Sequence, residues 1–127
     1  MIVEPVLAGL RALIVEDEYI VADDLKRLLQ RHGASTVKLS GTIDDALMQI
    51  GRDGFEFALL DINIRGDTAF ILADAFVLVK VPFAFVTGYN RSVIPERFSA
   101  VPNWGKPYSD REVVAGIQYL WKRPVTA

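Results

Sequence analysis

Residues 57–61 have the sequence Phe57-Ala58-Leu59-Leu60-Asp61, an apolar run that ends in a single carboxylate. A run this short and this apolar is typical of a strand that is buried on both faces of a parallel sheet. Open α/β sheets place their functional groups at the carboxyl ends of such strands. The sequence therefore predicts that Asp61 lies at the mouth of a functional site.

Polar residues with related chemistry follow, or lie near, other candidate strands. They are the acids Glu16-Asp17-Glu18 after residues 10–15, Thr87 after residues 83–86, and Lys106 in the stretch Trp104-Gly105-Lys106-Pro107-Tyr108. An acid pair, a lone aspartate, a hydroxyl and an ammonium form a set that suits a phosphoryl group and a divalent cation. We therefore expect these residues to meet at one edge of the sheet.

Strand-like and helix-like segments alternate along the chain, which favours a parallel sheet covered by helices on both faces. The flavodoxin-like strand order 2-1-3-4-5 is the common five-stranded arrangement, and it makes the first and third strands neighbours. The fourth helix should be irregular, because Pro95 interrupts a short segment, residues 92–99. The expected strands are residues 10–15, 36–39, 57–60, 83–86 and 101–104. The other expected helices are residues 20–31, 43–50, 68–79 and 110–121.

Length and composition indicate one cytoplasmic globular domain. The chain has 127 residues, of which 51% are hydrophobic and 24% charged. A net charge of −2 with scattered Lys and Arg gives no electrostatic footprint for nucleic acid. With no Cys there is neither a disulfide framework nor a thiolate metal site. Residues 1–10 do not resemble a signal peptide, and no uncharged run approaches the ~18 residues that a membrane span needs.

Four short motifs, taken in their order along the chain, give a family resemblance. The chain resembles the receiver domain of bacterial response regulators over about residues 10–122, so that residues 1–127 form one receiver domain with an N-terminal extension at 1–9. This resemblance implies a CheY-like, doubly wound five-stranded sheet. The motifs are Leu13-Ile14-Val15-Glu16-Asp17, Leu59-Leu60-Asp61, Val86-Thr87-Gly88 and Gly105-Lys106-Pro107.

The resemblance implies a phosphoacceptor site. Asp61 would be the nucleophile that takes a phosphoryl group from the phosphohistidine of a sensor histidine kinase or a histidine phosphotransfer protein. The Lys106 ammonium and the Thr87 hydroxyl would contact the oxygens of that group. Taken singly, a Lys in a turn is usually solvated and a Thr at a strand end usually caps the backbone. The combination with Asp61 and the acid pair is what points to function.

The same resemblance implies a Mg²⁺ (or Mn²⁺) site built from oxygen ligands. Asp17 and Asp61 would each give one carboxylate oxygen, and the backbone carbonyl of Asn63 would give a third. Glu16 would act through a water or by orienting Asp17. Glu18 is better explained as an acid at a solvated helix start, where it meets the helix dipole favourably.

The stretch Pro82-Phe83-Ala84-Phe85-Val86-Thr87-Gly88-Tyr89 resembles a receiver subgroup marked by Phe-Ala-Thr-Gly-X-Tyr, commonly stand-alone proteins that pair with HWE-type histidine kinases. Val86 and the position of Tyr89 depart from that pattern. Many receivers carry an aromatic switch residue three positions before the lysine, where this chain has Asn103. Tyr89 is our candidate for a substitute switch, and Trp104 is a second candidate.

The leading functional interpretation is a single-domain, phosphorylation-dependent signalling protein that is not an enzyme and acts on a downstream protein through a surface change. One alternative is a constitutive pseudo-receiver that serves as a binding module. The other is an aspartyl-phosphate hydrolase, which typically has a second acid two residues after the nucleophile, where this chain has Asn63.

Overall fold

The computed structural model describes residues 7–52, 54–87, 94–105 and 108–122. Its centre is a five-stranded sheet in the order β2-β1-β3-β6-β7, with every neighbouring pair parallel. A separate two-stranded hairpin, β4–β5, interrupts the strand numbering, so this order is the predicted 2-1-3-4-5 arrangement. The flavodoxin-like fold is thereby confirmed. The strands of the sheet are β1 (Arg11–Val15), β2 (Thr36–Ser40), β3 (Phe57–Asp61), β6 (Phe83–Thr87) and β7 (Asn103–Gly105).

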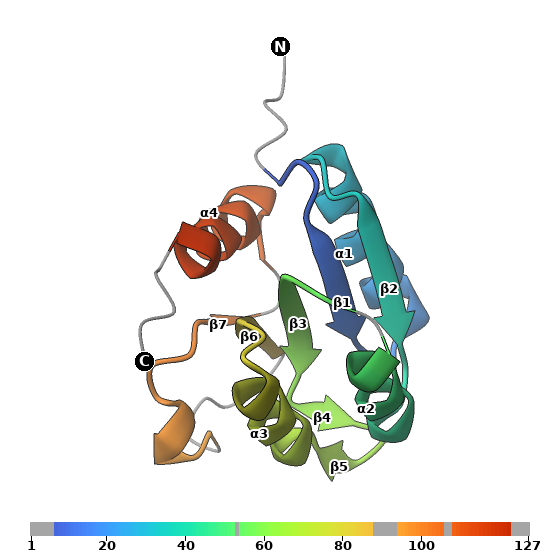
Figure 1. The fold of residues 1–127 in the computed structure, drawn as a ribbon, viewed down its shortest axis with the longest axis vertical. Coiled ribbons are helices and arrows are strands. Elements are labelled where there is room, and N and C mark those ends of the chain that lie inside the picture. The colour runs from blue at the N-terminus through green and yellow to red at the C-terminus, as the bar shows by residue number, and fades with distance from the viewer. Residues whose placement is uncertain (1–6, 53, 88–93, 106–107, 123–127) are drawn as a thin grey trace.

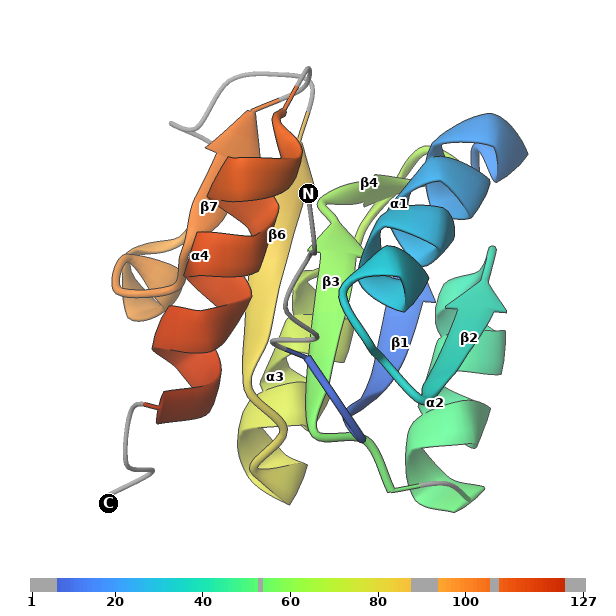
Figure 2. The ribbon, with the colours of Figure 1, turned by 90° about the horizontal axis from the view of Figure 1, so that it is seen from above.

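Helices cover both faces of the sheet, as Figures 1 and 2 show. Helices α1 (Tyr19–Arg31) and α4 (Asp110–Lys122) lie on one face, and α2 (Ile43–Arg52) and α3 (Phe70–Val79) lie on the other. In the part of the chain that the structure describes, no helix is long and apolar enough to cross a membrane.

Two hydrophobic cores share the sheet because side chains alternate between its faces. Along β1, Ile14 packs with α1 and α4, whereas Leu13 and Val15 pack with α2 and α3. All five residues of β3 are buried, as the apolar run predicts. The core beneath α3 is aromatic: its rings belong to Phe70, Phe76, Phe83, Phe85 and Phe98.

Side-chain caps fix where two helices begin. The Asp45 N–H donates to Thr42 Oγ1 (3.1 Å), as expected of a cap before α2. At α4 the Glu112 N–H donates to Ser109 Oγ (3.1 Å), and the Ser109 N–H points back to the Glu112 carboxylate (3.4 Å). This reciprocal pattern is a capping box, and it identifies Ser109 as the cap of the last helix.

Two elements begin two residues later than the sequence predicts. Helix α3 begins at Phe70 rather than residue 68, because Thr68 is paired in β5. Strand β7 begins at Asn103, two residues later than predicted, because the Val101 N–H donates to the Phe98 carbonyl in a turn and Pro102 has no N–H to give to a strand. In the described part of residues 92–99, the helical structure is one 3₁₀ turn, η2 (Glu96–Phe98), consistent with the irregular fourth helix expected there.

The β4–β5 hairpin was not predicted from the sequence. It consists of β4 (Asn63–Ile64) and β5 (Asp67–Thr68), joined by the two residues Arg65 and Gly66. Both connecting residues have positive φ angles, 52° and 85°, as a two-residue turn that matches the twist of a hairpin requires. Figure 1 shows the hairpin at the carboxyl end of β3.

Trp104 of β7 packs against α4 at a glycine. A Cβ atom added to Gly116 would lie 1.9 Å from Trp104 Cζ2, far inside van der Waals contact. Trp104 is 8% exposed and belongs to the core that α1 and α4 cover. The absence of a side chain at Gly116 is therefore what lets the indole lie under α4.

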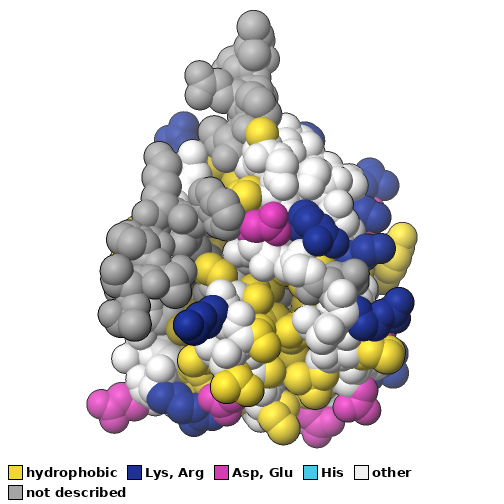
Figure 3. Space-filling view, viewed as in Figure 1, with side chains coloured by type: hydrophobic (Ala, Val, Ile, Leu, Met, Phe, Trp, Pro, Cys, Tyr) yellow, Lys and Arg dark blue, Asp and Glu magenta, His cyan; other side chains and the backbone are white. Residues whose placement is uncertain are grey.

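Large hydrophobic side chains remain exposed on α2 and α3. Figure 3 shows hydrophobic atoms gathered on the lower half of the face where these two helices lie. Helix α3 has few polar residues, so its outward side is apolar as well as its buried side. The exposed large hydrophobic residues on the two helices are Leu47, Met48, Ile71, Val77, Leu78 and Val79.

Candidate functional site

Neighbouring parallel strands bring the predicted acids to one edge of the sheet. Glu16 and Asp17 directly follow β1, and Asp61 is the last residue of β3. These strands are paired, with Val15 opposite Leu60, so the residues that follow them emerge side by side. The Glu16 N–H also donates to the backbone carbonyl of Ser40 (2.9 Å), which extends the β1–β2 pairing by one residue.

Carboxylate oxygens of three acids gather at this edge. One oxygen each from Glu16, Asp17 and Asp61 lies within 4.8 Å of the other two. Glu16 is 4% exposed and Asp61 is 9% exposed, whereas Asp17 is exposed. Like charges this close repel one another, and a divalent cation relieves that repulsion. The donor set consists of hard oxygen atoms, which fits Mg²⁺ or Mn²⁺.

Each of the three carboxylates accepts a backbone hydrogen bond. The Glu18 N–H donates to Glu16 Oε1 (3.1 Å), and the Asn63 N–H donates to Asp61 Oδ1 (3.3 Å). In both cases the donor lies two residues after the acid. Asp17 differs, because Oδ2 accepts from the Arg65 N–H (2.8 Å) at the tip of the β4–β5 hairpin.

The backbone register relates the remaining predicted residues to this edge. Asp61 pairs with Val86, and the following residue, Thr87, ends β6 opposite Gly105 of β7. Lys106 comes directly after Gly105 in the sequence. The side chain of Thr87 and all of Lys106 and Tyr89 lie outside the described part of the structure, so their predicted roles stay predictions. Asn63 is described, as the first residue of β4, and the role of its carbonyl as a metal ligand also stays a prediction.

Asn103 occupies the position where many receivers have an aromatic switch residue. Within the described residues, its buried Oδ1 has no hydrogen-bond partner. It lines a hollow of about 380 Å³ together with Ile94, Phe98, Ser99 and Val101. Trp104 points to the opposite face, toward α4, so this second switch candidate lies in the core between β7 and α4.

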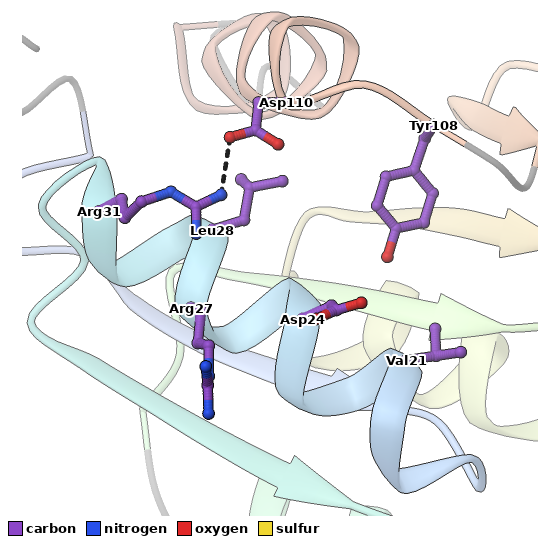
Figure 4. Close-up of a pocket in the computed structure, with 7 residues that line it drawn as sticks. All are labelled: Val21, Asp24, Arg27, Leu28, Arg31, Tyr108 and Asp110. Carbon is purple, nitrogen blue, oxygen red and sulfur yellow. Dashed lines mark hydrogen bonds and ion pairs between the residues drawn. The ribbon is translucent and has the colours of Figure 1, made fainter.

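A groove of about 510 Å³ lies between α1 and the start of α4 (Figure 4). The Arg31 guanidinium crosses one end of it and contacts the Asp110 carboxylate at 2.8 Å. Tyr108, two residues after Lys106, projects over the other end. The remaining lining residues all belong to α1: Val21, Asp24, Arg27 and Leu28.

The contact from Arg65 to Asp17 was missed from the sequence. Its local signal was the Arg65-Gly66-Asp67 stretch, since glycine followed by aspartate is typical of a turn. No sequence pattern indicates, however, that the tip of this turn would meet an acid 48 positions earlier. The contact depends on the tertiary placement of the hairpin beside the end of β1.

Comparison with known proteins supports the fold and the receiver family. No family model matches the chain. The sensory transduction protein LytT of Bacillus anthracis is 30% identical over 120 residues, which are 90% of this chain and 48% of LytT. SdrG from Sphingomonas melonis is 30% identical, with a TM-score of 0.79 over 88% of this chain and 96% of SdrG. The chain belongs to the receiver-domain family of response regulators.

Two further solved structures agree with the assignment of this chain to the receiver-domain family. A solution structure of SdrG in a BeF₃-activated conformation matches with a TM-score of 0.75 at 30% identity, over 90% of this chain and 98% of that one. The receiver domain of Erythrobacter litoralis PhyR has a TM-score of 0.82 over 94% of this chain and 97% of that domain. At 22% identity, the PhyR match concerns the fold alone. The chain spans about half the length of the curated relative LytT.

Proposed function

We propose that this receiver accepts a phosphoryl group on Asp61 from a sensor histidine kinase or a histidine phosphotransfer protein. The observation that supports the proposal best is the cluster of Glu16, Asp17 and Asp61, whose carboxylate oxygens lie within 4.8 Å of one another. The similarity to SdrG, which adopts a BeF₃-activated conformation, gives independent support. BeF₃⁻ bound to a carboxylate has the shape and charge of an acyl phosphate.

The reaction uses Asp61 as the nucleophile. One carboxylate oxygen would form a bond to phosphorus, while the P–N bond of the donor phosphohistidine breaks and its electron pair stays on the imidazole nitrogen, which then takes up a proton. Such a transfer needs in-line positioning and charge neutralisation more than covalent assistance. The Asn63 N–H, which donates to Asp61 Oδ1, helps to fix the orientation of the carboxylate.

The charge of the site calls for a divalent cation. Asp17 and Asp61 would hold Mg²⁺ or Mn²⁺ directly, with the Asn63 carbonyl as a third ligand and Glu16 acting on Asp17 or on a bound water. When bound, the ion supplies positive charge that offsets the carboxylates and the transferred group. Lys106 and Thr87 would contact the phosphoryl oxygens; the support is that Thr87 ends β6 opposite Gly105 and that Lys106 follows Gly105 in the sequence.

The upstream partner would be a kinase of the HWE type. The support is the Phe83-Ala84-Phe85-Val86-Thr87-Gly88-Tyr89 stretch, which resembles the subgroup that pairs with such kinases. In this proposal the chain itself catalyses no turnover on a separate substrate. It acts in the cytoplasm by presenting an altered surface to a downstream protein, with Tyr89 and Trp104 as candidate switch residues.

Intact mass spectrometry tests this function directly. A small phosphodonor and Mg²⁺ are added to wild-type protein and to Asp61→Asn, which is nearly isosteric and cannot form the acyl phosphate. We expect one phosphoryl adduct on the wild type, stable or slowly decaying, and none on the variant. No adduct on either protein indicates a pseudo-receiver, and many donor turnovers per protein indicate a hydrolase. An adduct on Asp61→Asn contradicts Asp61 as the acceptor.

A further inference from the structure

The β4–β5 hairpin makes a contact that the proposed reaction does not by itself require. Its tip donates the Arg65 N–H to Asp17 Oδ2 at 2.8 Å, a distance typical of a charge-assisted hydrogen bond. A carboxylate has two oxygens and about four acceptor sites, so this bond leaves oxygen capacity for a cation. The contact therefore orients Asp17 without occupying it fully.

Arg65 adopts an unfavourable backbone conformation in the turn that makes this contact. Its φ of 52° lies in the left-handed region, which side chains other than Gly, Asn and Asp rarely adopt. Backbone strain of this kind persists only where the surrounding structure enforces it, and it is concentrated at functional sites. The strained residue here lies next to an acid of the candidate metal cluster.

The hairpin is anchored firmly enough to act as a support. Ile62 and Ile64, at its base, are 4% and 1% exposed and belong to the core under α2 and α3. The Ala69 N–H closes the base by donating to the carbonyl of Ile62 at 2.7 Å. The turn that carries the Arg65 N–H is thus fixed by the buried Ile62 and Ile64 and by the pairing of β4 with β5.

Asp17 needs such a support more than the other two acids do. Glu16 and Asp61 are buried and accept N–H groups from residues two positions later. Asp17 is exposed, and the N–H it accepts comes from a separate element. Groups that hydrogen-bond to metal ligands fix the orientation of the ligand and commonly change metal affinity by about 10–100-fold.

We propose that the β4–β5 hairpin is a positioning element for Asp17, and that its Arg65 N–H sets the divalent-cation affinity of the acidic cluster. This inference rests on the proposed function, since it assumes that the cluster binds a cation. Arg65 acts here through its backbone and not through its guanidinium. The amino acid at position 65 matters only so far as it allows the left-handed turn.

Two glycine variants separate this role from general stability. Gly66 has a φ of +85° and Gly9 a φ of +80°, and a Cβ added at either position meets no atom within 4 Å. Valine at either position is therefore strained to a similar degree, and its Cβ meets no neighbouring atom. Gly66 is in the hairpin turn, whereas Gly9 precedes β1 at the opposite edge of the sheet.

Calorimetric titration with Mg²⁺ alone is the deciding experiment. We expect Gly66→Val to bind Mg²⁺ about tenfold more weakly than wild type, and Gly9→Val to bind within about twofold of it. Equal affinity in wild type and Gly66→Val overturns the inference and leaves the proposed function intact. An undetectable Mg²⁺ affinity in the wild type itself contradicts the cation site of the proposed function together with this inference.

Amide hydrogen exchange measured in the presence of a chelator provides a readout without metal. The Arg65 N–H should exchange slowly in wild type and at least tenfold faster in Asp17→Ala, because the variant removes its acceptor. Asp24→Ala, which removes an exposed acid of α1, is the control and should leave the rate unchanged. If Arg65 exchanges equally fast in all three proteins, then the hairpin does not hold Asp17, and the inference fails whatever the metal affinity is.

Discussion

Asp17 is the acid of the cluster whose role depends most on its neighbours, because it is exposed while Glu16 and Asp61 are buried. An exposed carboxylate can reach toward a hydrated ion. In the proposed function, its role is therefore that of a metal ligand rather than of a group that stabilises the fold. Replacing it should change metal binding without changing the stability of the metal-free protein by much.

We predict that Asp17→Ala lowers Mg²⁺ affinity by roughly tenfold or more, because each ligand contributes a large share of the binding in a site with few protein ligands. Calorimetry measures the affinity, and urea denaturation in chelator measures stability. Asp24→Ala serves as the control, because this exposed acid of α1 lies outside the cluster. Undiminished affinity in Asp17→Ala would remove Asp17 from the site.

A second residue-scale prediction concerns Gly116. An added Cβ would lie 1.9 Å from Trp104 Cζ2, so Gly116→Ala should destabilise the protein by about 1–3 kcal/mol, as overpacked cores generally do. Gly51 provides the matched control, because it is also helical and a Cβ there meets no atom within 4 Å. Gly51→Ala should be neutral or stabilising. Urea denaturation that finds both variants equally stable would contradict the contact.

Among the elements, α2 depends on a hydrogen-bond network at its first turns. Ser40 is 3% exposed, and its hydroxyl donates to Asp45 Oδ2 at 2.7 Å. The Gln49 amide donates to the same oxygen at 2.7 Å. The hydrogen bond from Ser40, followed by that from Gln49, holds the pKa of Asp45 below its usual value of 3.8. The network therefore links the end of β2 to α2 through an ionised carboxylate.

This network gives the element-scale prediction. A carboxyl group whose pKa is lowered on folding stabilises the folded state above its unfolded pKa, and that contribution is lost as pH falls through the folded pKa. Part of the stability of the wild type should therefore disappear as pH falls below about 4. Ser40→Ala should lower the free energy of unfolding by about 1 kcal/mol at pH 7. The variant should lose less stability than the wild type on acidification, because the pKa of Asp45 is lowered less without the Ser40 hydroxyl.

Denaturant titrations at pH 7 and pH 3 measure both effects. Ser35→Ala is the control, because the Ser35 hydroxyl contacts backbone carbonyls of Gly9 and Leu10 rather than a carboxylate. Its stability should follow that of the wild type across the same pH range. Parallel pH profiles for Ser40→Ala and wild type would show that Asp45 is not the group responsible.

At the scale of the whole molecule, the sheet belongs to both cores. Each strand of the centre contributes alternate side chains to the α1–α4 side and the α2–α3 side, so neither core can be lost while the other stays intact. We predict a single cooperative unfolding transition in urea. NMR methyl signals of Leu29 on one side and Leu72 on the other should disappear at the same midpoint. Separate midpoints would show two independently folding layers.

The sequence predicted the sheet because burial on both faces leaves a direct trace in composition. The run before Asp61 is apolar throughout, and all of β3 is buried. The acids could be placed because parallel strands end at a common edge, which is a property of topology. The hairpin could not be predicted in this way, since it depends on Arg65 accepting a left-handed backbone. Tertiary contacts impose this left-handed conformation on Arg65, whereas the intrinsic backbone preference of arginine opposes it.

The contact between Trp104 and Gly116 also constrains the order in which these two residues can be substituted during evolution. A lineage that first exchanges the tryptophan for a smaller side chain gains the space that an alanine at position 116 then occupies. A lineage that acquires the alanine first passes through a clash at 1.9 Å. The double variant Trp104→Leu/Gly116→Ala should therefore be more stable than the sum of the two single substitutions predicts. Of the two orders of substitution that lead to this double variant, the order that begins at Trp104 avoids the clash and the order that begins at Gly116 does not.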